Sequence, residues 1–505
     1  MSSDRILRSP RTAAILCLLL LLPGTFAIGR DTTVIVVHAD RVRTPVTYGI
    51  GASWHAVSED SIDMDTSYTW ALRTINARGS AWGGNPPLAD TAAWRQLAWH
   101  ARWLGFTFLR VELEARMYEP ARNVFDWNNE EMGALYRILD HAEASGVNVF
   151  LQQMWSNVGW NAYPGVQPLL SAPRSVDDFA EGLAALMEHL TRVKGYTCIR
   201  WLCITNEPPG GSWGSWWMTG DSAAPYTPAL RAVRRALDAR GLSVALSGPD
   251  WTDLPLFDST KIDFDPYISA YDIHSYQGID SAKQQRLGAW VRWARAHEKP
   301  MFLSEIGDMS LGWRDTNAGP KTFAAALSNA ESILRGLDAG VSAFNRWSFT
   351  NRGDLDGQWQ LVRTWDIQQK RYLDGVRIEP AAYYGYGIIT RFWIPGASVL
   401  VTDAVADTLI LAQALRGAEG EITIYIVNKG RSASAVTVMV SGGGSSDRTL
   451  YRYVAGEETV DRPDYRMDPS LVIQKRGEPI RVVLPARSIT TLSSLKMPHE
   501  APARR

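Results

Sequence analysis

The feature that most constrains the fold is an alternation of short apolar runs with longer amphipathic segments between residues 47 and 347. Eight runs have the length and the aromatic or β-branched content of buried strands, and segments with helical periodicity separate them. Glycine stands at positions 105, 146, 241 and 340, just before a run begins again, as is typical of helix C-caps. We expect strands over 47–50, 107–113, 147–152, 199–204, 243–246, 271–274, 301–303 and 343–347, and helices over 91–104, 131–145, 176–193, 228–239, 282–297 and 321–337.

This order of elements predicts an α/β fold, a (β/α)8 TIM barrel with insertions, over residues 47–385. An open, doubly wound sheet is the alternative. Its nucleotide-binding form requires a turn with three spaced glycines after the first strand. The corresponding stretch here, Gly49-Ile50-Gly51-Ala52-Ser53-Trp54, lacks the third glycine, so the barrel is favoured.

The sequence changes character at residue 386. From there to residue 495, short β runs alternate with turn signals such as Asn428-Lys429-Gly430 and Gly442-Gly443-Gly444, which predicts an accompanying β-sandwich domain. Segment 28–46 contains the run TTVIVV, and we expect it to add a strand to this sandwich. The polar tail, 496–505, is expected to be disordered.

The N-terminus has the order of features found in secretory signal peptides. Arg5, Arg8 and Arg11 precede an apolar run over 13–22, and small residues follow up to Ala27. We therefore expect residues 1–27 to be a signal peptide that directs secretion. The apolar run is short for a bilayer span, although an uncleaved anchor is the alternative.

Charge and cysteine content exclude several classes of function. The net charge is −1 without a basic run, which argues against nucleic acid as a partner. Apart from Cys17 in the signal segment, only Cys198 and Cys203 are present, and their spacing on one strand points them to opposite faces. We expect two buried thiols and no metal cluster. Most of the 21 tryptophans are expected in the core, and the others suit a carbohydrate groove.

Two glutamates mark the ends of expected strands. Glu207 follows the run 199–204, and Glu305 follows the run 301–303. The carboxyl ends of parallel barrel strands gather catalytic groups, and glycoside hydrolysis uses two carboxylates there. For each glutamate alone, a structural ion pair is the simpler alternative.

These residues carry a family resemblance. Asn206-Glu207-Pro208 at the end of strand four and Ser304-Glu305 at the end of strand seven resemble the clan A glycoside hydrolases. The barrel with a sandwich that receives an N-terminal strand is similar to families 30 and 39 of that clan. The resemblance extends to further strand ends where the clan keeps pocket residues: Arg110, His274, Tyr276 and Trp347.

The resemblance implies a role for each residue. Glu207 would be the general acid and then the base, with a raised pKa, and Glu305 would be the nucleophile. Asn206 would hold the sugar 2-hydroxyl. Arg110 would support the nucleophile, unless it simply pairs with Glu112 on the same face of its strand. Tyr276 would orient Glu305, while His274 would line the pocket and Trp347 would form a sugar platform, although both could instead be core residues.

Other polar and aromatic residues lie near the same strand ends. They are candidates for additional subsites: Trp54, His55, Trp155, Asn157, Asp250 and Trp251. The remaining acidic candidates are Glu112, Glu114 and Asp308, with Glu112 as the first replacement should Glu207 or Glu305 not be catalytic.

Together these features predict a secreted retaining glycosidase that cleaves O-glycosidic, β-linked bonds in oligo- or polysaccharides through a covalent glycosyl-enzyme. We expect a carbohydrate substrate, no cofactor, no nucleic acid partner and no stable membrane insertion after signal cleavage. A non-catalytic carbohydrate-binding protein and a transglycosylase on the same barrel are the alternatives. Xylosides, glucosides, galactans and arabinosides all remain compatible with the sequence, because the loops that shape the cleft, 55–90 and 350–359, carry no diagnostic pattern.

Overall fold

A computed structural model describes most of the chain. The expected signal peptide, residues 1–27, lies outside the described residues, as does all of the tail except Lys496 and Met497. The described residues are 33–56, 83–155, 159–166, 168–208, 216–312, 318–352, 357–369, 371–405, 408–442, 449–457, 460, 467, 469–474 and 478–497.

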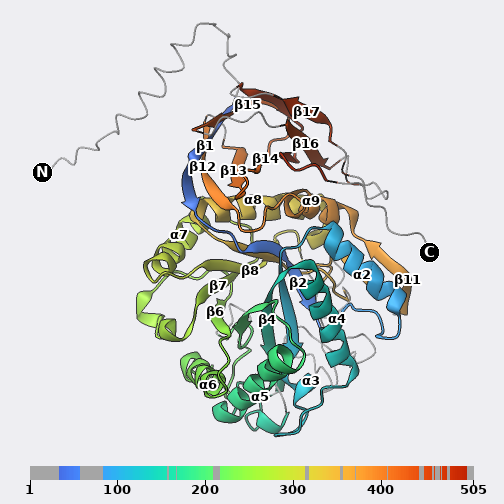
Figure 1. Cartoon of the computed structure of the whole chain (residues 1–505), viewed down its shortest axis with the longest axis vertical. Helices are drawn as coiled ribbons and strands as arrows, with labels where there is room; N and C mark the ends of the chain where they lie inside the picture. The colour runs from blue at the N-terminus through green and yellow to red at the C-terminus, as the bar shows by residue number, and fades with distance from the viewer. Residues whose placement is uncertain are drawn as a thin grey trace, which may run out of the picture.

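Eight parallel strands form a closed barrel, in chain order from β2 to β9 (Figure 1). This confirms the predicted fold class. Most strands extend further toward the carboxyl end than predicted, so that several residues expected in loops belong to strands. The strands are β2 (Gly49–His55), β3 (Phe108–Glu114), β4 (Asn148–Trp155), β5 (Ile199–Cys203), β6 (Ala245–Trp251), β7 (Ala270–Ser275), β8 (Met301–Ile306) and β9 (Ala343–Arg346).

The helices begin and end where the sequence provides caps. Asp90, Asn129, Ser175, Asp280 and Thr322 each accept a backbone N–H of the first helical turn that follows. The glycines at 146 and 340 end their helices in the left-handed conformation, as predicted. The helices around the barrel are α2 (Thr91–Trp103), α3 (Ala115–Tyr118), α4 (Glu130–Ser145), α5 (Val176–Glu188), α6 (Tyr226–Ala239), α7 (Ser281–Ala296) and α8 (Phe323–Ala339). Shorter helical turns are η2 (Gly159–Asn161), η3 (Pro168–Leu170), η4 (His189–Val193), η5 (Ser259–Lys261), η6 (Asp265–Tyr267) and η7 (Gly319–Lys321).

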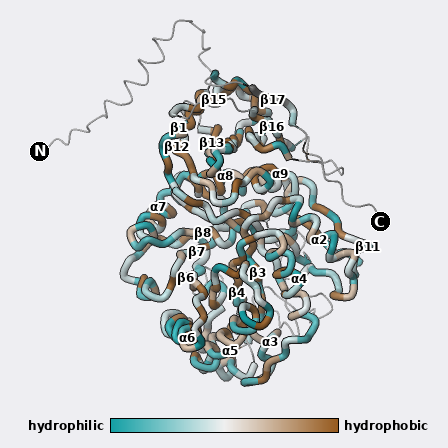
Figure 2. The backbone as a smooth tube through the Cα atoms, viewed as in Figure 1, coloured by the Kyte–Doolittle hydropathy of each residue, from teal (hydrophilic) through white to brown (hydrophobic). Residues whose placement is uncertain are grey.

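Aromatic side chains fill the interior of the barrel at the amino ends of its strands. Phe108, Phe150, Trp201 and Phe302 form one buried cluster there, and the rings of Trp201 and Phe302 meet edge to face at 5.1 Å. A larger core lies between the strands and the surrounding helices. Figure 2 shows hydrophobic residues along strands such as β4, whereas helix α6 alternates hydrophilic and hydrophobic residues. Because this aromatic cluster fills one end of the barrel interior, it supports the polar side chains near the carboxyl ends of the strands.

The second domain is a nine-stranded sheet that folds over its own hydrophobic core. β1 (Thr33–Thr44) lies in this sheet, antiparallel to β12 and parallel to β15. Helix α8 packs against β13 and β14, which joins the two domains (Figure 1). The C-terminal strands are β12 (Ser398–Val405), β13 (Ile410–Arg416), β14 (Ile422–Asn428), β15 (Ser434–Ser441), β16 (Thr449–Gly456), β17 (Leu471–Gln474), β18 (Ile480–Leu484) and β19 (Ser488–Ser493).

In the sequence, the barrel and the C-terminal strands are separated by elements that the sequence pattern did not predict. A hairpin of β10 (Val362–Asp366) and β11 (Arg371–Ile378) precedes α9 (Pro380–Thr390). Helix α9 runs through the boundary expected at residue 385, and the next strand begins only at Ser398. None of the helices in the described ranges combines the length and the apolar character needed to cross a membrane.

Candidate active site

The loop after β5 presents Glu207 in a strained but well-anchored conformation. Its φ of 40° lies in the left-handed region, which a residue with a side chain seldom adopts. The Glu207 N–H donates to Oδ2 of Asp250 at 3.2 Å, and Nε2 of Gln152 donates to the carbonyl of Thr205 at 2.6 Å. Neighbouring strands β4 and β6 therefore hold this loop in place, and the strain lies at a functional position, where it is commonly found.

Glu207 and Glu305 face each other across the carboxyl end of the barrel. A carboxylate oxygen of Glu207 lies within 4.8 Å of one of Glu305, and both side chains are buried. His274 on β7 lies between them, with Nδ1 2.7 Å from Oε1 of Glu207 and 3.2 Å from Oε2 of Glu305. The fold thus brings together two carboxyls that are almost a hundred residues apart in sequence.

Two donors hold the Glu305 carboxylate. A guanidinium nitrogen of Arg110 contacts Oε1, and the Tyr276 hydroxyl donates to Oε2. The other terminal nitrogen of Arg110 donates to Oδ1 of Asn206 at 2.9 Å. Although burial disfavours the charged form of Arg110, the carboxylates of Glu305, Glu112 and Asp250 raise its pKa above the ordinary value. A permanent cation and a hydroxyl donor therefore fix the position of the Glu305 carboxylate.

Glu207 lies in a different electrostatic environment. Burial raises the pKa of Glu207, and the nearby carboxylates of Glu305 and Asp250 act in the same direction, whereas the contact with His274 opposes them. Burial also disfavours the charged form of His274, but Asp250, Glu305 and Glu207 raise its pKa well above the ordinary value. A carboxyl whose pKa is raised in this way is suited to act as a general acid.

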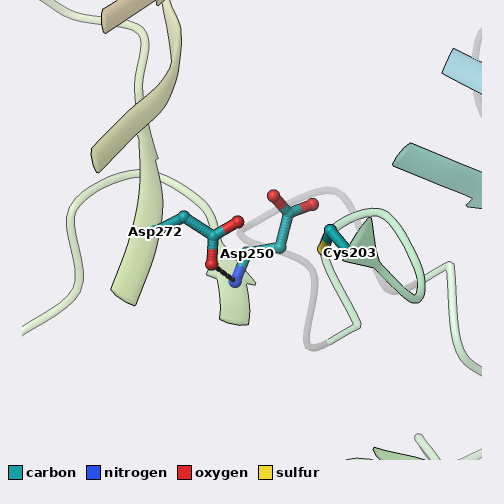
Figure 3. Close-up of side chains that lie close together, drawn as sticks. All are labelled: Cys203, Asp250 and Asp272. Atoms are coloured by element: carbon teal, nitrogen blue, oxygen red, sulfur yellow. Dashed lines mark hydrogen bonds between the residues drawn. The ribbon is translucent and has the colours of Figure 1, made fainter. Parts of the chain in front are cut away.

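Asp250 on β6 supports this arrangement from below. Its Oδ1 lies 3.0 Å from Nε2 of His274, and its Oδ2 accepts from Glu207 and from Nε2 of Gln152. The carboxyl of Asp272 accepts the Asp250 N–H at 3.2 Å, and the sulfur of Cys203 lies on the other side of Asp250 (Figure 3). Although burial opposes ionisation, the His274 and Arg110 cations lower the pKa of Asp250. Asp250 is therefore an anion that fixes the position of His274.

A second buried pair, Glu112 and His55, lies next to Arg110. Glu112 on β3 contacts Arg110 through one oxygen, and its other oxygen lies 3.1 Å from Nε2 of His55 on β2. Burial raises the pKa of Glu112 to about 8, with Arg110 opposing and Glu305 adding to the rise. Burial and the Arg110 charge hold the pKa of His55 well below its ordinary value. The His55 ring meets Trp347 edge to face at 5.1 Å, which links this pair to the rim of the site.

Among the described residues, two groups of side chains have ligand atoms close enough to hold a metal ion: Glu207 with His274 and Glu305, and Cys203 with Asp250 and Asp272. In the first group the raised pKa of His274 favours an imidazolium, which donates protons and cannot ligate a metal. In the second group burial raises the pKa of both Cys203 and Asp272, so that both retain their protons. Both groups are therefore poor cation sites in this protonation state.

The structure brings together most of the residues that the sequence predicted for the site. One connected network contains six of them: Arg110, Asn206, Glu207, His274, Tyr276 and Glu305. Trp347 contacts this network through His55, and its ring centre lies 5.9 Å from the guanidinium carbon of Arg110.

The prediction for Trp54 is wrong. Strand β2 continues to His55, and alternation along it directs Ser53 and His55 inward and Trp54 outward. The Trp54 side chain is 1% exposed, meets Phe349 edge to face at 4.7 Å, and donates its indole N–H to Asn85. It is a core residue and cannot reach a substrate.

Other candidates lie away from the carboxylates. Trp251 alternates with Asp250 and packs on Phe264 and Trp290 in the helical layer. Glu114 pairs with Arg116, and Asp308 accepts the N–H of Ser310. Trp155 ends β4, but its side chain lies outside the described residues, as does Asn157 entirely.

Sequence reasoning missed several polar residues of the network, including Gln152, Ser53 and Asp272. Gln152 bonds Thr205 and Asp250, and the Ser53 hydroxyl accepts from Arg110 at 3.4 Å. Both are polar residues within otherwise apolar strands, and that pattern was the available signal. Trp359, which meets Tyr276 edge to face at 5.5 Å, lies in a segment without periodicity.

Comparison with known proteins identifies the family of the chain. The model of the family described as cellulase (glycosyl hydrolase family 5) matches residues 63–334, just over half of the chain. No match was found among curated proteins.

Solved structures with a similar fold include several glycosidases. A family 30 subfamily 8 xylanase from Clostridium acetobutylicum is 15% identical, with a TM-score of 0.59 over 91% of this chain and 98% of that chain. An endo-β-1,6-glucanase is 14% identical, with a TM-score of 0.62 over 93% and 96%. An α-L-arabinofuranosidase from Thermotoga maritima is 13% identical, with a TM-score of 0.57 over 92% and 99%.

At these identities the solved structures show the shared fold, a barrel with an attached β domain. The family match shows the kind of enzyme, and the expected resemblance to clan A is confirmed. The chain therefore belongs to the cellulase family of glycoside hydrolases (glycosyl hydrolase family 5), and it is a glycosidase that hydrolyses O-glycosyl compounds.

Proposed function

We propose that the protein is a secreted, retaining β-glycosidase that acts on oligo- or polysaccharides, with Glu207 as the acid/base and Glu305 as the nucleophile. The observation that carries this proposal is the spacing of the two carboxylates, whose nearest oxygens lie within 4.8 Å. Retaining enzymes keep their carboxyls about 5–5.5 Å apart, whereas inverting enzymes need roughly 6.5–9.5 Å to admit a water.

In the first step, an oxygen of Glu305 attacks the anomeric carbon while Glu207 gives its proton to the departing glycosidic oxygen. The bond between carbon and glycosidic oxygen breaks, and a glycosyl ester of Glu305 forms. The raised pKa of Glu207 supports its role as proton donor. Arg110 and Tyr276 hold the attacking carboxylate of Glu305 in place.

In the second step, the Glu207 carboxylate takes a proton from water, and the water oxygen attacks the anomeric carbon. The bond to Glu305 breaks, and the sugar leaves with its original anomeric configuration. Because the first step neutralises Glu305 as an ester, the repulsion that raised the pKa of Glu207 decreases, which suits its change from acid to base.

The remaining residues position the sugar. Asn206 is held through its Oδ1 by Arg110, which orients its amide beside Glu207, and we assign it to the sugar 2-hydroxyl. A contact at that hydroxyl strengthens as the oxocarbenium-like transition state forms. Trp347 is held by His55 and Arg110 and supplies the apolar surface on which a sugar ring stacks.

The roles of the two glutamates can be tested with Glu305→Ala and Glu207→Ala. Each is expected to lower kcat/KM by at least 10²-fold, which is the lower end of general acid catalysis. Azide should partly restore Glu207→Ala on substrates with good leaving groups, because it attacks the glycosyl-enzyme without needing a base. Glu188→Ala on the outer helix α5 is the control. A loss below tenfold in either active-site variant, with folding intact, would refute the assignment.

Secretion is proposed from the N-terminal segment. Residues 1–27 have the basic, apolar and small-residue order of a signal peptide. Expression of the full chain in a secreting host, followed by N-terminal sequencing of the exported protein, is expected to give a mature chain that begins after Ala27. Retention of the intact N-terminus in the membrane fraction would instead support an anchor.

A further inference from the structure

A cavity of about 490 Å³ with a mixed polar and apolar lining lies between the sandwich and the barrel, on elements that carry none of the active-site residues. Strands β12 and β13 form one wall, and helices α7 and α8 form the other. The two strands pair only over Ser398–Leu400 and Ala414–Arg416. Beyond these paired residues β12 continues along β1 and β13 continues along β14, so the two strands separate where they face α7 and α8.

Two buried side chains in this wall have polar atoms without a hydrogen bond to any described residue. They are Oε1 of Gln413 and Oγ1 of Thr402, and the two side chains are 4% and 7% exposed. The orientation of the Gln413 amide is set by Asp338, which accepts from Nε2 at 3.3 Å and leaves Oε1 for another donor. Burying an acceptor without a donor is unfavourable, so this wall is suited to a ligand that donates hydrogen bonds from hydroxyl groups.

The charged residues of the cavity are already neutralised. Asp338 accepts from Gln284 at 2.6 Å and pairs with Arg43 at 3.0 Å. Arg335 pairs with Glu331 at 2.8 Å and donates to Gln284 at 2.9 Å. A charged ligand would have to compete with these pairs, whereas a neutral ligand would not.

Apolar side chains complete the lining. Leu334, Ile410 and Leu411 present hydrocarbon surface next to the amide and hydroxyl groups. A neutral molecule with hydroxyls on its edge and C–H groups on its faces matches such a wall, and the volume lies within the usual range of 300–1,000 Å³ for ligand sites. We propose that this cavity is a second saccharide-binding site, which holds a neutral oligosaccharide away from the catalytic carboxylates.

The proposal can be tested by calorimetry on the full chain. Glu207→Gln combined with Glu305→Gln prevents turnover, and the probes are the β-1,4-linked tetrasaccharides of xylose and of glucose. At least one probe is expected to bind at two sites per chain. Adding Gln413→Ala should weaken one of them at least tenfold. Ala404→Trp, which fills the cavity from an exposed position, should abolish the same site without removing a buried contact.

The matched control is Gln368→Ala, an exposed glutamine in the turn after β10, which should change neither site. Binding that Gln413→Ala and Ala404→Trp both leave unchanged would overturn the proposal, as would binding of neither probe. If Glu207 and Glu305 are not the catalytic residues, the double glutamine variant retains activity. Gln413→Ala and Ala404→Trp still remove saccharide binding at the cavity in that case. The two failures are therefore distinguishable.

Discussion

Replacing Glu112 by glutamine should stabilise the protein relative to the wild type by an amount that increases as the pH rises. Glu112 is fully buried between Arg110 and His55, and burial raises its pKa from 4.5 to about 8. In the unfolded chain this carboxyl ionises near 4.5, whereas in the folded protein it holds its proton up to about pH 8. Between these values folding takes up a proton, so the wild-type free energy of unfolding falls with increasing pH.

The magnitude follows from the pKa change. One pKa unit corresponds to about 1.36 kcal/mol, so the rise from 4.5 to about 8 corresponds to roughly 5 kcal/mol at most. The contribution is fully present below pH 4.5, is lost gradually up to about pH 8, and is constant above that. Glutamine resembles the protonated acid and cannot ionise. The difference in unfolding free energy, Glu112→Gln minus wild type, should therefore grow with pH by about 1.4 kcal/mol per unit.

The assay is guanidinium unfolding followed by tryptophan fluorescence at pH 5, 6, 7 and 8. The control is Glu188→Gln, because hydrogen bonds from Arg240 lower the pKa of Glu188 and its pH-dependent contribution changes only in the acid range. The difference between Glu188→Gln and wild type should stay constant from pH 5 to 8. A constant or shrinking difference for Glu112→Gln would show that Glu112 is ionised in the folded protein.

Two further substitutions distinguish a residue that acts in the active site from a residue that only stabilises the core. Tyr276→Phe removes the hydroxyl that donates to Glu305 and keeps the ring against Trp359. A hydrogen bond to a charged group contributes about 1.5–3 kcal/mol. The kcat/KM on an aryl glycoside should therefore fall about 10- to 150-fold. An unchanged kcat/KM would contradict this role. Trp54→Phe should leave KM unchanged while lowering the unfolding free energy by about 1–3 kcal/mol, since Trp54 is a core residue. A raised KM with unchanged stability would restore Trp54 to the substrate site.

The barrel could be predicted from sequence because its signal is repeated eight times. Most residues of each apolar run are buried, and glycines such as Gly146 and Gly340 end helices just before the next strand. The active-site glutamates were accessible for the same reason, since strand ends collect the polar groups of a barrel. The elements without such repetition, β10, β11, α9 and β17, were not anticipated.

The error at Trp54 comes from a strand boundary. The run 47–50 was expected to end before Trp54, but β2 continues to His55, and in a strand each one-residue step changes the face. The same alternation places Asp250 inside the barrel and Trp251 outside. Sequence patterns predict the presence of a strand more accurately than its last residue. The position of the last residue determines which side chain points into the site.

The connections among polar residues were beyond the sequence. Arg110 was expected to pair with either Glu305 or Glu112, and the structure shows that it contacts both. Such sharing depends on how three strands meet, which no local pattern encodes. The position of Asp250 beneath His274 likewise depends on the pairing of β6 with β7.

The most direct test of the central claim is to trap the covalent intermediate. The protein is incubated with a β-configured 2-deoxy-2-fluoro glycoside that carries a good leaving group, digested, and mapped by mass spectrometry. The expected result is one sugar attached to the peptide containing Glu305, with no label in Glu305→Ala. A label on another residue, or full activity without any trapped ester and with inverted product, would contradict the assignment of Glu305 as the nucleophile.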